Sequence, residues 1–304
     1  MKPHHSRNSR PAAALWRRRA LQVLSGAVLA AAMPLAQATT YTLQDLNSTL
    51  TVDPSSSAGI LSWTVDGVNQ LNQQWFWGRE GSSGPEESLN TLNLIGAIVS
   101  DTDFTGNSDT LALLYGDATT KPDSLFTVTL KLSLVGQSFG SKTSDLFTVG
   151  KITNKAGSSS INYHAFQYSD FNLSNNPGND TVVTTDNGKT FVQSDGGMIL
   201  TDGLAIGVTP PDHWQVATSP TILNSLNNTN PTTLSDSSSG GPDNMAYARE
   251  WDSTLDPGKA FEISLDQHIT VPNPGTVLLL GAGMLGLAGA SRRNRRKNQS
   301  MDQD

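Results

Sequence analysis

One loop of the chain carries oxygen-bearing side chains at the spacing that calcium-binding loops use. Between residues 101 and 109 such side chains occupy positions 1, 3, 5, 7 and 9, and a glycine stands at position 6, where the loop turns sharply. The twelfth position is Ala112, so the bidentate glutamate of such loops is missing. The alternative is a turn that is rich in Asp and Asn for backbone reasons alone. The candidate calcium ligands are Asp101, Asp103, Thr105, Asn107 and Asp109.

A second group of residues is suited to carbohydrate chemistry. Glycoside hydrolysis uses two carboxyl groups that face each other roughly 5 to 10 Å apart. The acidic residues available for such a pair are Glu80, Glu86, Glu87, Glu250 and Asp252. Trp75 and Trp77 offer rings on which a sugar can stack, but their alternate spacing places both on one face of a strand, where a core position is expected. A carbohydrate-binding module and a carbohydrate-active enzyme therefore both stay open as alternatives.

Other catalytic chemistry has no sequence signal. The chain contains no cysteine, no Gly-x-Ser-x-Gly elbow, no His-Glu-x-x-His motif and no phosphate-binding glycine loop. Beyond the N-terminal region its histidines are His164, His213 and His268, which are far apart and have no metal-ligand spacing. We expect each of them to be solvated or hydrogen-bonded. No catalytic residue is assigned, and calcium is the single candidate cofactor.

The elements that position these residues are predicted to be β-strands. From Phe126 to Leu134 apolar and polar residues alternate strictly, and the same pattern runs from Phe261 to Val271. A period of two marks strands with one buried face. Asp66-Gly67 and Asn187-Gly188 supply hairpin turns between such segments. We predict an all-β fold, an antiparallel β-sandwich or jelly roll of about 10 to 14 strands, with one short helix after Ser219 as its N-cap.

The N-terminal 38 residues are typical of a secretory signal peptide. Six basic residues precede a short apolar stretch, Pro34 breaks it, and Ala36 and Ala38 are small at the positions that a signal peptidase reads. Cleavage is expected between Ala38 and Thr39. The alternative is an uncleaved anchor.

The charge of the exported body differs from that of the whole chain, which is −7. Of the 20 basic residues, 6 lie in residues 1–38 and 5 in residues 292–304, whereas these two regions hold only 2 of the 27 acidic residues. The remainder, 9 basic and 25 acidic residues, has a net charge of −16. Such a field repels nucleic acid, so no nucleic-acid partner is expected.

The C-terminal segment has the layout of a stop-transfer signal. Residues 275–290 carry no charge, and at 1.5 Å per residue they span about 24 Å, which is short for a membrane-spanning helix. A basic cluster follows, and it is expected to stay cytoplasmic. The residues of this cluster are Arg292, Arg293, Arg295, Arg296 and Lys297.

This layout resembles the PEP-CTERM sorting signal, the C-terminal tag of proteins that are handled by exosortase. The tag combines a Pro-Glu-Pro-like motif, a short glycine-rich span and a terminal arginine cluster. Asn273 stands where the family usually has glutamate. The matching motif residues are Val271, Pro272, Asn273, Pro274, Gly275 and Thr276. Residues 164–173 and 249–264 resemble segments of uncharacterised PEP-CTERM proteins, which implies no activity.

The resemblance divides the chain and implies a cellular role. Residues 1–38 are the signal peptide, 39–271 the β-sandwich body, 272–297 the sorting signal with its transmembrane segment 275–290, and 298–304 a cytoplasmic tail. The resemblance implies a Gram-negative bacterium that makes exopolysaccharide, an exosortase-type membrane protease as partner, and transient anchoring in the inner membrane. The leading hypothesis is a non-catalytic protein of the cell surface or extracellular matrix, associated with exopolysaccharide or biofilm. An ordinary single-span inner-membrane anchor is the alternative.

Overall fold

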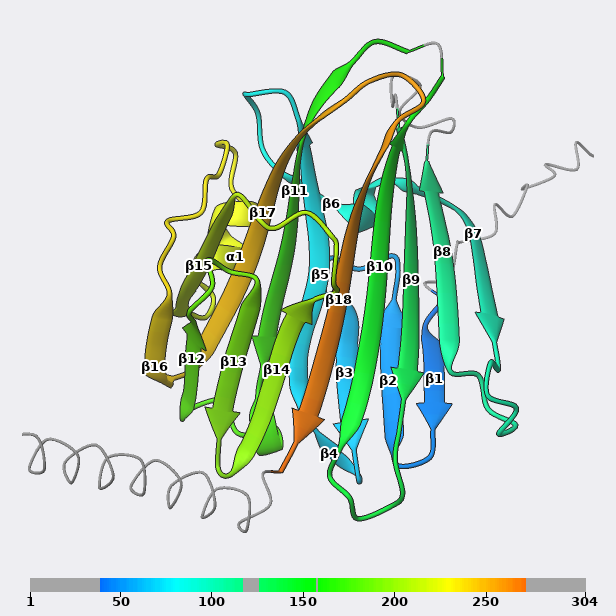
Figure 1. Ribbon diagram of the computed structural model, residues 1–304, viewed down its shortest axis with the longest axis vertical. Coiled ribbons are helices and arrows are strands. Elements are labelled where there is room, and N and C mark those ends of the chain that lie inside the picture. The colour runs from blue at the N-terminus through cyan, green and yellow to red at the C-terminus, as the bar shows by residue number, and fades with distance from the viewer. Residues whose placement is uncertain (1–38, 117–125, 157, 272–304) are drawn as a thin grey trace, which may run out of the picture. The chain divides into compact units, whose positions relative to one another are not determined.

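The structure, a computed structural model, describes residues 39–116, 126–156 and 158–271, and these form two β-sheets (Figure 1). Strand makes up 58% and helix 5% of them, which confirms the predicted all-β class. The signal peptide, the sorting motif from Pro272 onward and the transmembrane segment lie outside the described residues, so these predictions stay predictions. Within the described ranges, no helix combines the length and the apolar character that crossing a membrane requires.

Sheet A holds nine strands, and its central path runs in the order β1-β2-β3-β5-β11-β17-β15. β4 pairs with β3, and β6 pairs with β5. All pairings are antiparallel except a short parallel contact between β3 and β5. The strands are β1 (Tyr41–Asp45), β2 (Ser48–Asp53), β3 (Gly59–Val65), β4 (Val68–Asn69), β5 (Leu71–Glu80), β6 (Glu87–Ser88), β11 (Ile161–Phe171), β15 (His213–Thr218) and β17 (Met245–Leu255).

Sheet B also holds nine strands, in the order β16-β12-β13-β14-β18-β10-β9-β8-β7. Its strands are β7 (Asn93–Ser100), β8 (Thr110–Gly116), β9 (Phe126–Val135), β10 (Ser144–Asn154), β12 (Asp180–Thr184), β13 (Thr190–Asp195), β14 (Met198–Leu204), β16 (Ser239–Asp243) and β18 (Ala260–Thr270). The two sheets together have more strands than the 10 to 14 predicted, in part because β4 and β6 are only two residues long.

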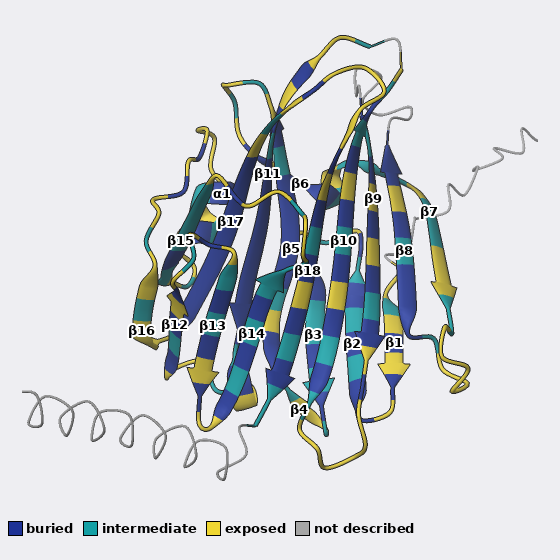
Figure 2. Ribbon diagram, viewed as in Figure 1, coloured by how far each residue is buried: buried dark blue, intermediate teal, exposed yellow. Residues whose placement is uncertain are grey.

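The two sheets pack face to face over one hydrophobic core. In β9 and β18 buried residues recur at every second position, as the sequence pattern predicted (Figure 2). Aromatic pairs bridge the sheets: Phe126 meets Tyr163 with ring centroids 4.9 Å apart, and Phe191 stacks on Tyr247 at 4.4 Å. The fold is therefore the antiparallel sandwich that the alternation indicated.

The outer face of sheet A is covered where β5, β11 and β17 run side by side. Most of β11 and β17 is buried on both faces, so these strands lack the simple alternation of β9 (Figure 2). The helix α1 (Thr221–Leu226) forms part of this cover. Asn227, the residue that follows α1, accepts a hydrogen bond of 3.2 Å from the indole N–H of Trp77. Two short 3-10 helices, η1 (Leu89–Thr91) and η2 (Leu173–Asn175), complete the secondary structure of the described residues.

The helix α1 lies where it was predicted, but its cap differs. Pro220 occupies the N-cap position, and no side chain caps the first turn. The hydroxyl of Ser219 instead donates to Oδ2 of Asp170 at 2.8 Å. A tertiary hydrogen bond therefore takes the place of the local cap that the sequence indicated.

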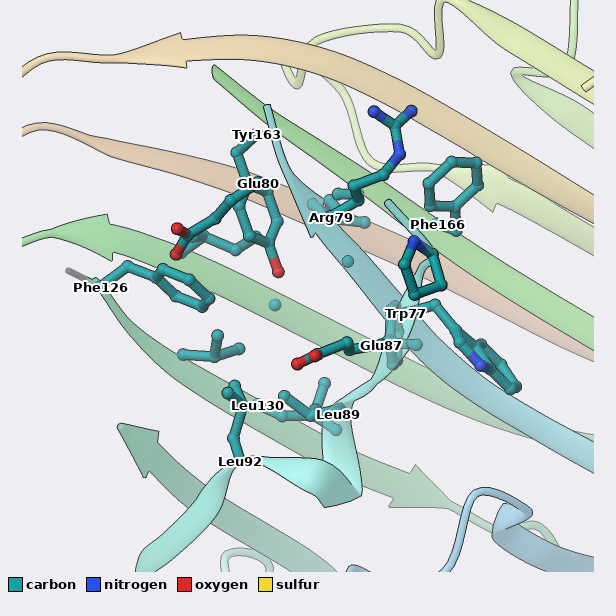
Figure 3. A pocket seen from close by; sticks show the side chains of 18 of the residues that line it. Trp77, Arg79, Glu80, Glu87, Leu89, Leu92, Phe126, Leu130, Tyr163 and Phe166 are labelled. Carbon is teal, nitrogen blue, oxygen red and sulfur yellow. The ribbon is translucent and has the colours of Figure 1, made fainter. Parts of the chain in front are cut away.

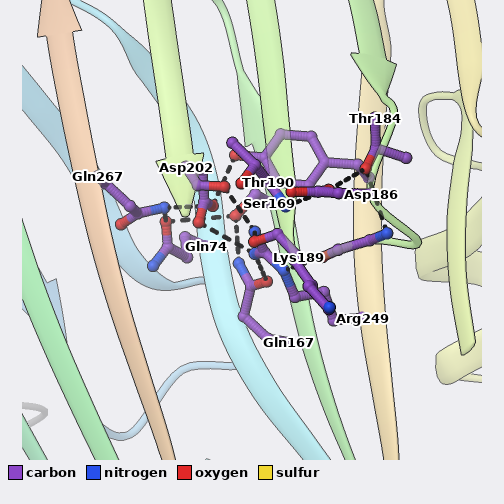
Figure 4. A network of polar contacts seen from close by, with 12 residues as sticks. Gln74, Gln167, Ser169, Thr184, Asp186, Lys189, Thr190, Asp202, Arg249 and Gln267 are labelled. Carbon is purple, nitrogen blue, oxygen red and sulfur yellow. Dashed lines mark hydrogen bonds and ion pairs between the residues drawn. The ribbon is translucent and has the colours of Figure 1, made fainter. Parts of the chain in front are cut away.

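A buried polar network lies between the sheets (Figure 4). The guanidinium of Arg249 is 3.0 Å from Oδ1 of Asp202, and both side chains are fully buried. Arg249 also donates to the carbonyl oxygen of Gly188 at 2.8 Å and to Gln167 at 2.9 Å. Oδ2 of Asp202 accepts hydrogen bonds from Tyr247 at 2.8 Å and from Gln267 at 2.7 Å. This network pairs a buried cation with a buried anion and gives both further partners.

Candidate binding cavity

The five carboxylates considered for carbohydrate chemistry fall into three separate places. Glu80 and Glu87 line one cavity. Glu86 is buried in an ion pair with Arg79 at 2.9 Å. Glu250 and Asp252 project from the outer face of β17, near His164. The first place combines two carboxylates with a cavity.

The cavity has a volume of about 530 Å³ and lies between the two sheets (Figure 3). Strands β5 and β11 line it from sheet A, strands β9, β10 and β18 line it from sheet B, and residues 83–92 close one side. Its size falls within the range of small-molecule sites, roughly 300 to 1,000 Å³. Its apolar side chains include Phe76, Leu89, Leu92, Phe126, Val128, Leu130, Ile152 and Ile263.

Glycines on the two sheets help to explain why the core is hollow here. Gly150 of β10 pairs with Leu130 and Ile263 on the neighbouring strands, and a Cβ atom at Gly150 would meet both side chains at 4.0 Å, an ordinary contact. Gly78 of β5 leaves room for the hydroxyl of Tyr163, which would lie 1.9 Å from a Cβ atom there. Gly150 thus leaves space beside Leu130 and Ile263, whereas Gly78 makes room for the hydroxyl of Tyr163.

An aromatic wall bounds the cavity. Phe126 and Tyr163 meet edge to face at an angle of 68°, one from each sheet. Burial raises the pKa of the Tyr163 hydroxyl, and the carboxylates of Glu80 and Glu87 raise it further. The phenol therefore stays protonated and keeps its capacity to donate a hydrogen bond.

The polar side chains of the cavity include two carboxylates besides Arg79, Ser83 and Tyr163. Glu80 and Glu87 are exposed. In Figure 3 the carboxylate of Glu80 lies near the rings of Tyr163 and Phe126, and that of Glu87 lies near Leu89 and Leu130. Arg79 also lines the cavity, but its charge is balanced by Glu86. Glu86 is fixed in turn by the backbone N–H and the hydroxyl of Thr232, both at 2.8 Å. The cavity therefore combines an apolar interior with two carboxylates on its exposed side.

The carboxylates on β17 have a different environment. Burial raises the pKa of Glu250 to about 7. A hydrogen bond of 2.8 Å, which Oε2 accepts from the backbone N–H of Leu234, acts in the opposite direction and lowers the pKa. Asp252 contacts Nδ1 of His164, and ligand atoms of these two residues and of Glu250 lie within 4.8 Å of one another. Glu250 is only 1% exposed, so a polysaccharide cannot reach it. Binding in the cavity is better supported by this geometry than hydrolysis at β17.

The three histidines of the body are hydrogen-bonded, as expected. His164 contacts Asp252, while Nδ1 of His213 lies 3.1 Å from Asp236. Nδ1 of His268 lies 2.6 Å from Oδ1 of Asp145 on the solvent-facing side of sheet B. Each histidine therefore has a carboxylate partner.

The expected core role of the two tryptophans is also confirmed. Trp75 is fully buried and Trp77 is 2% exposed. Trp77 packs edge to face on Tyr168 with ring centroids 6.1 Å apart. The rings that a sugar could stack on are therefore those of the cavity wall, Phe126 and Tyr163.

The loop predicted to bind calcium brings three of its five candidate ligands together. Ligand oxygens of Asp101, Asp103 and Asp109 lie within 4.8 Å of one another. Thr105 donates to Asp103 from its backbone and from its hydroxyl, and Asn107 is exposed. We call the three aspartates the acidic cluster.

The sorting residues are almost entirely outside the described ranges. Val271 is partly buried against the core, one residue after β18 ends. Of the predicted signal-peptidase site, only Thr39 is described. The other residues of the motif, the basic cluster, Ala36 and Ala38 lie outside the described part of the chain.

Comparisons with known proteins give distant similarities of structure. No protein-family model matches the chain, and no curated protein matches it. A bacterial glucoamylase complexed with acarbose is 13% identical, with a TM-score of 0.46 over 75% of this chain, which spans 31% of that enzyme. A GalM/aldose epimerase homologue from C. elegans is 8% identical, with a TM-score of 0.48 over 77% of this chain and 100% of that protein. What this chain binds must therefore be inferred from its own residues.

Proposed function

We propose that the body is an exported carbohydrate-binding protein that takes a neutral saccharide into the cavity between the sheets. One observation carries this proposal: an aromatic wall and two exposed carboxylates line the same cavity of about 530 Å³. A sugar ring has an apolar face that packs on aromatic rings and hydroxyl groups that donate to carboxylates. The cavity offers both kinds of partner.

The two carboxylates at the cavity disfavour an acidic sugar beside them. Glu80 and Glu87 lie on its exposed side, and Arg79, which also lines it, is paired with Glu86. A uronate or sulfated sugar would bring a further negative charge close to these carboxylates. Leu130, Ile152 and Ile263 line the cavity from sheet B, and they favour a methyl or acetyl substituent over a hydroxyl group. Deoxy and N-acetyl sugars are therefore expected to bind more tightly than glucose.

Calorimetric titration of the full-length chain tests the proposal. Neutral mono- and oligosaccharides, including 6-deoxy and N-acetyl sugars, are compared with the corresponding uronic acids. Binding of neutral sugars without binding of uronates supports the proposal. Preferential binding of uronates, or of no saccharide at all, contradicts it.

A matched pair of variants places the binding in the cavity. Gly150→Ala adds one methyl group at ordinary contact distance and is expected to retain binding. Gly150→Leu fills the cavity and is expected to abolish binding. If Gly150→Leu binds like the wild type while its melting temperature is unchanged, the ligand lies elsewhere.

The entrance is tested by neutral replacements of its acids. Glu87→Gln and Glu80→Gln each weaken a charge-assisted hydrogen bond to a sugar hydroxyl, so affinity should fall roughly tenfold. Glu262→Gln, an exposed carboxylate on β18, is the control and should leave affinity unchanged.

We also propose that the body reaches the cell surface or matrix by the exosortase route. The motif from Val271 to Thr276, the uncharged span 275–290 and the basic cluster support this. Two prolines disfavour helix and strand at the motif, which keeps it accessible to a protease. An exposed surface location would bring the cavity into contact with exopolysaccharide.

Intact-mass measurement of protein recovered from the cell surface tests the sorting proposal. The mature chain is expected to begin near Thr39 and to lack everything beyond roughly residue 276. Replacing Pro272 and Pro274 by alanine should leave the protein uncleaved in the membrane. A mature form that still carries Arg292 to Lys297 would instead identify an ordinary membrane anchor.

A further inference from the structure

The acidic cluster lies beside a fourth carboxylate that the loop pattern did not include. Asp45 is the last residue of β1 and is only 3% exposed. Its Oδ2 accepts a hydrogen bond of 2.7 Å from the backbone of Gly136, but its Oδ1 is buried and has no hydrogen-bond partner. The acidic cluster therefore has a buried, unpartnered oxygen next to it.

Asp45 and the cluster act on each other directly. Burial raises the pKa of Asp45, and the carboxylates of Asp103 and Asp109 raise it further, with Asp103 close enough for a side-chain contact. The backbone holds this arrangement: the N–H of Gln44 donates to the carbonyl of Ser108 at 2.8 Å. Asp45 therefore lies close to Asp103 and Asp109, but outside the set of three carboxylates whose ligand oxygens lie within 4.8 Å of one another.

Hydrogen bonds alone do not balance this charge. The carboxylate of Asp109 accepts from the backbone and the hydroxyl of Thr102 and from the backbone of Asp103, and that of Asp101 accepts from the backbone of Phe104 and of Gly106. A carboxylate has about four lone-pair positions, so oxygen capacity is left at Asp103, whose printed contacts use Oδ1, and at Asp45, whose Oδ1 has no partner. No ion pair recorded among the described residues joins any of the four carboxylates to a lysine, arginine or histidine.

We propose that Asp45 and the three carboxylates of the acidic cluster form a calcium site. Calcium takes six to eight oxygen ligands and accepts irregular geometry, which suits a set of carboxylates drawn from a strand and a loop. Asp45 thereby takes the place of the missing acid at position 112, since it supplies an additional carboxylate from outside the loop. The site is separate from the saccharide cavity and does not depend on it.

Such an ion would join the edges of the two sheets. β1 is the terminal strand of sheet A, and the acidic cluster lies in the connection between β7 and β8 at the far edge of sheet B (Figure 1). Calcium bound there would close this side of the sandwich. The expected result of binding is a higher melting temperature together with slower hydrogen exchange in β1 and in the β7–β8 connection.

The test uses the full-length chain, first treated with a chelator and then supplied with calcium chloride, magnesium chloride or potassium chloride at equal ionic strength. At a calcium concentration about tenfold above the dissociation constant, the melting temperature should rise by roughly 3 to 6 °C. Magnesium should give a smaller rise and potassium none, because magnesium retains its waters and demands stricter geometry.

Two variants and one control make the test decisive. Asp45→Asn still accepts the hydrogen bond from Gly136 but loses its charge, so the calcium-dependent rise should disappear without loss of stability in the chelated protein. Asp103→Asn, on the exposed side of the cluster, should also remove the rise. Asp243→Asn, an exposed acid in β16 at the opposite edge of sheet B, should retain it in full.

Three outcomes would overturn the proposal. One is a melting temperature of the wild type that does not respond to about 5 mM calcium, a level above the range of extracellular modules. Another is a calcium response that persists in both Asp45→Asn and Asp103→Asn. The third is an equal response in all salts, which would identify general screening of the acidic body.

Discussion

Asp202 and Asp45 are both buried carboxylates, and the protein treats them in opposite ways. Asp202 has a guanidinium at 3.0 Å and accepts from a phenol and an amide as well. Asp45 accepts one backbone N–H through Oδ2. Oδ1 accepts no hydrogen bond in either residue, but Oδ1 of Asp202 has its ion pair, whereas Oδ1 of Asp45 has no such partner and other carboxylates lie nearby. Burying a charge is costly unless a counter-charge and hydrogen bonds accompany it.

The difference separates a structural ion pair from a site that lacks its ion. The Arg249–Asp202 network carries its own countercharge and makes its contacts within the protein, so it holds the two sheets in one arrangement. The acidic cluster with Asp45 has excess negative charge at a sheet edge. Removing a charge should therefore harm the first region and relieve the second.

The largest effect is expected when the cation of the core network is removed. Arg249→Met leaves Asp202 buried without its countercharge, which should lower the free energy of unfolding by about 3 to 5 kcal/mol. Urea-induced unfolding of the full-length chain measures the change. The matched control is the double variant Arg249→Met with Asp202→Asn, which should recover part of the loss. Equal destabilisation of single and double variants would mean that the charge pairing is not the cause.

Asp180 is a third buried carboxylate, and it should make the free energy of unfolding depend on pH. Burial raises the pKa of Asp180 to about 7, and the charges of Asp195 and Asp170 act in the same direction. A carboxyl group whose pKa is raised on folding stabilises the protein below its unfolded pKa, near 3.8, and this contribution is lost as the pH rises through 7.

Asp180→Asn should remove this pH dependence. The variant is expected to be more stable than the wild type at pH 8 by about 2 to 4 kcal/mol, with a smaller difference at pH 4. Melting temperatures from pH 4 to pH 8 measure it. Glu250 and Asp266, whose pKa values burial also raises, should leave a residual slope of the same sign. A constant difference across the whole range would contradict the prediction.

The smallest effect is expected at an exposed contact between a histidine and a carboxylate. His268 and Asp145 lie 2.6 Å apart, but their side chains are 41% and 21% exposed. Exposed pairs contribute about 0 to 1 kcal/mol, and salt screens them. His268→Ala should therefore change the free energy of unfolding by less than about 1 kcal/mol, and by less still in high salt. A loss comparable to that of Arg249→Met would show that exposure does not govern these pairs.

Local pattern was sufficient for the strands and turns. The alternation from Phe126 to Leu134 and from Phe261 to Val271 gave β9 and β18, because a period of two is a property of one strand and its two faces. The Asp-Gly turn before Val68 has positive φ at both of its residues, as such hairpins need. The pattern failed for β11 and β17, because their outer face is covered by segments distant in sequence.

The candidate sites depend on pairings that no local pattern contains. Asp45 lies 56 residues before Asp101, and only the packing of β1 against the β7–β8 connection brings them together. Arg249 and Asp202 come from different sheets. The sequence did identify Glu80 and Glu87 as candidates, but the cavity that they share is lined by strands of both sheets, which no local pattern brings together.

The position of β18 in sheet B has a consequence for how the body folds. Among the strands of the described residues β18 comes last in the chain order, yet it lies between β14 and β10 in the middle of the sheet. Without it, sheet B consists of two separate four-stranded ribbons, β16-β12-β13-β14 and β10-β9-β8-β7. During synthesis, which proceeds from the N-terminus, the two ribbons therefore cannot pair through β18 until residues 260–270 have been made. The contacts that unite the sheet are of long sequence separation, which predicts slow, late and cooperative closure of the sandwich.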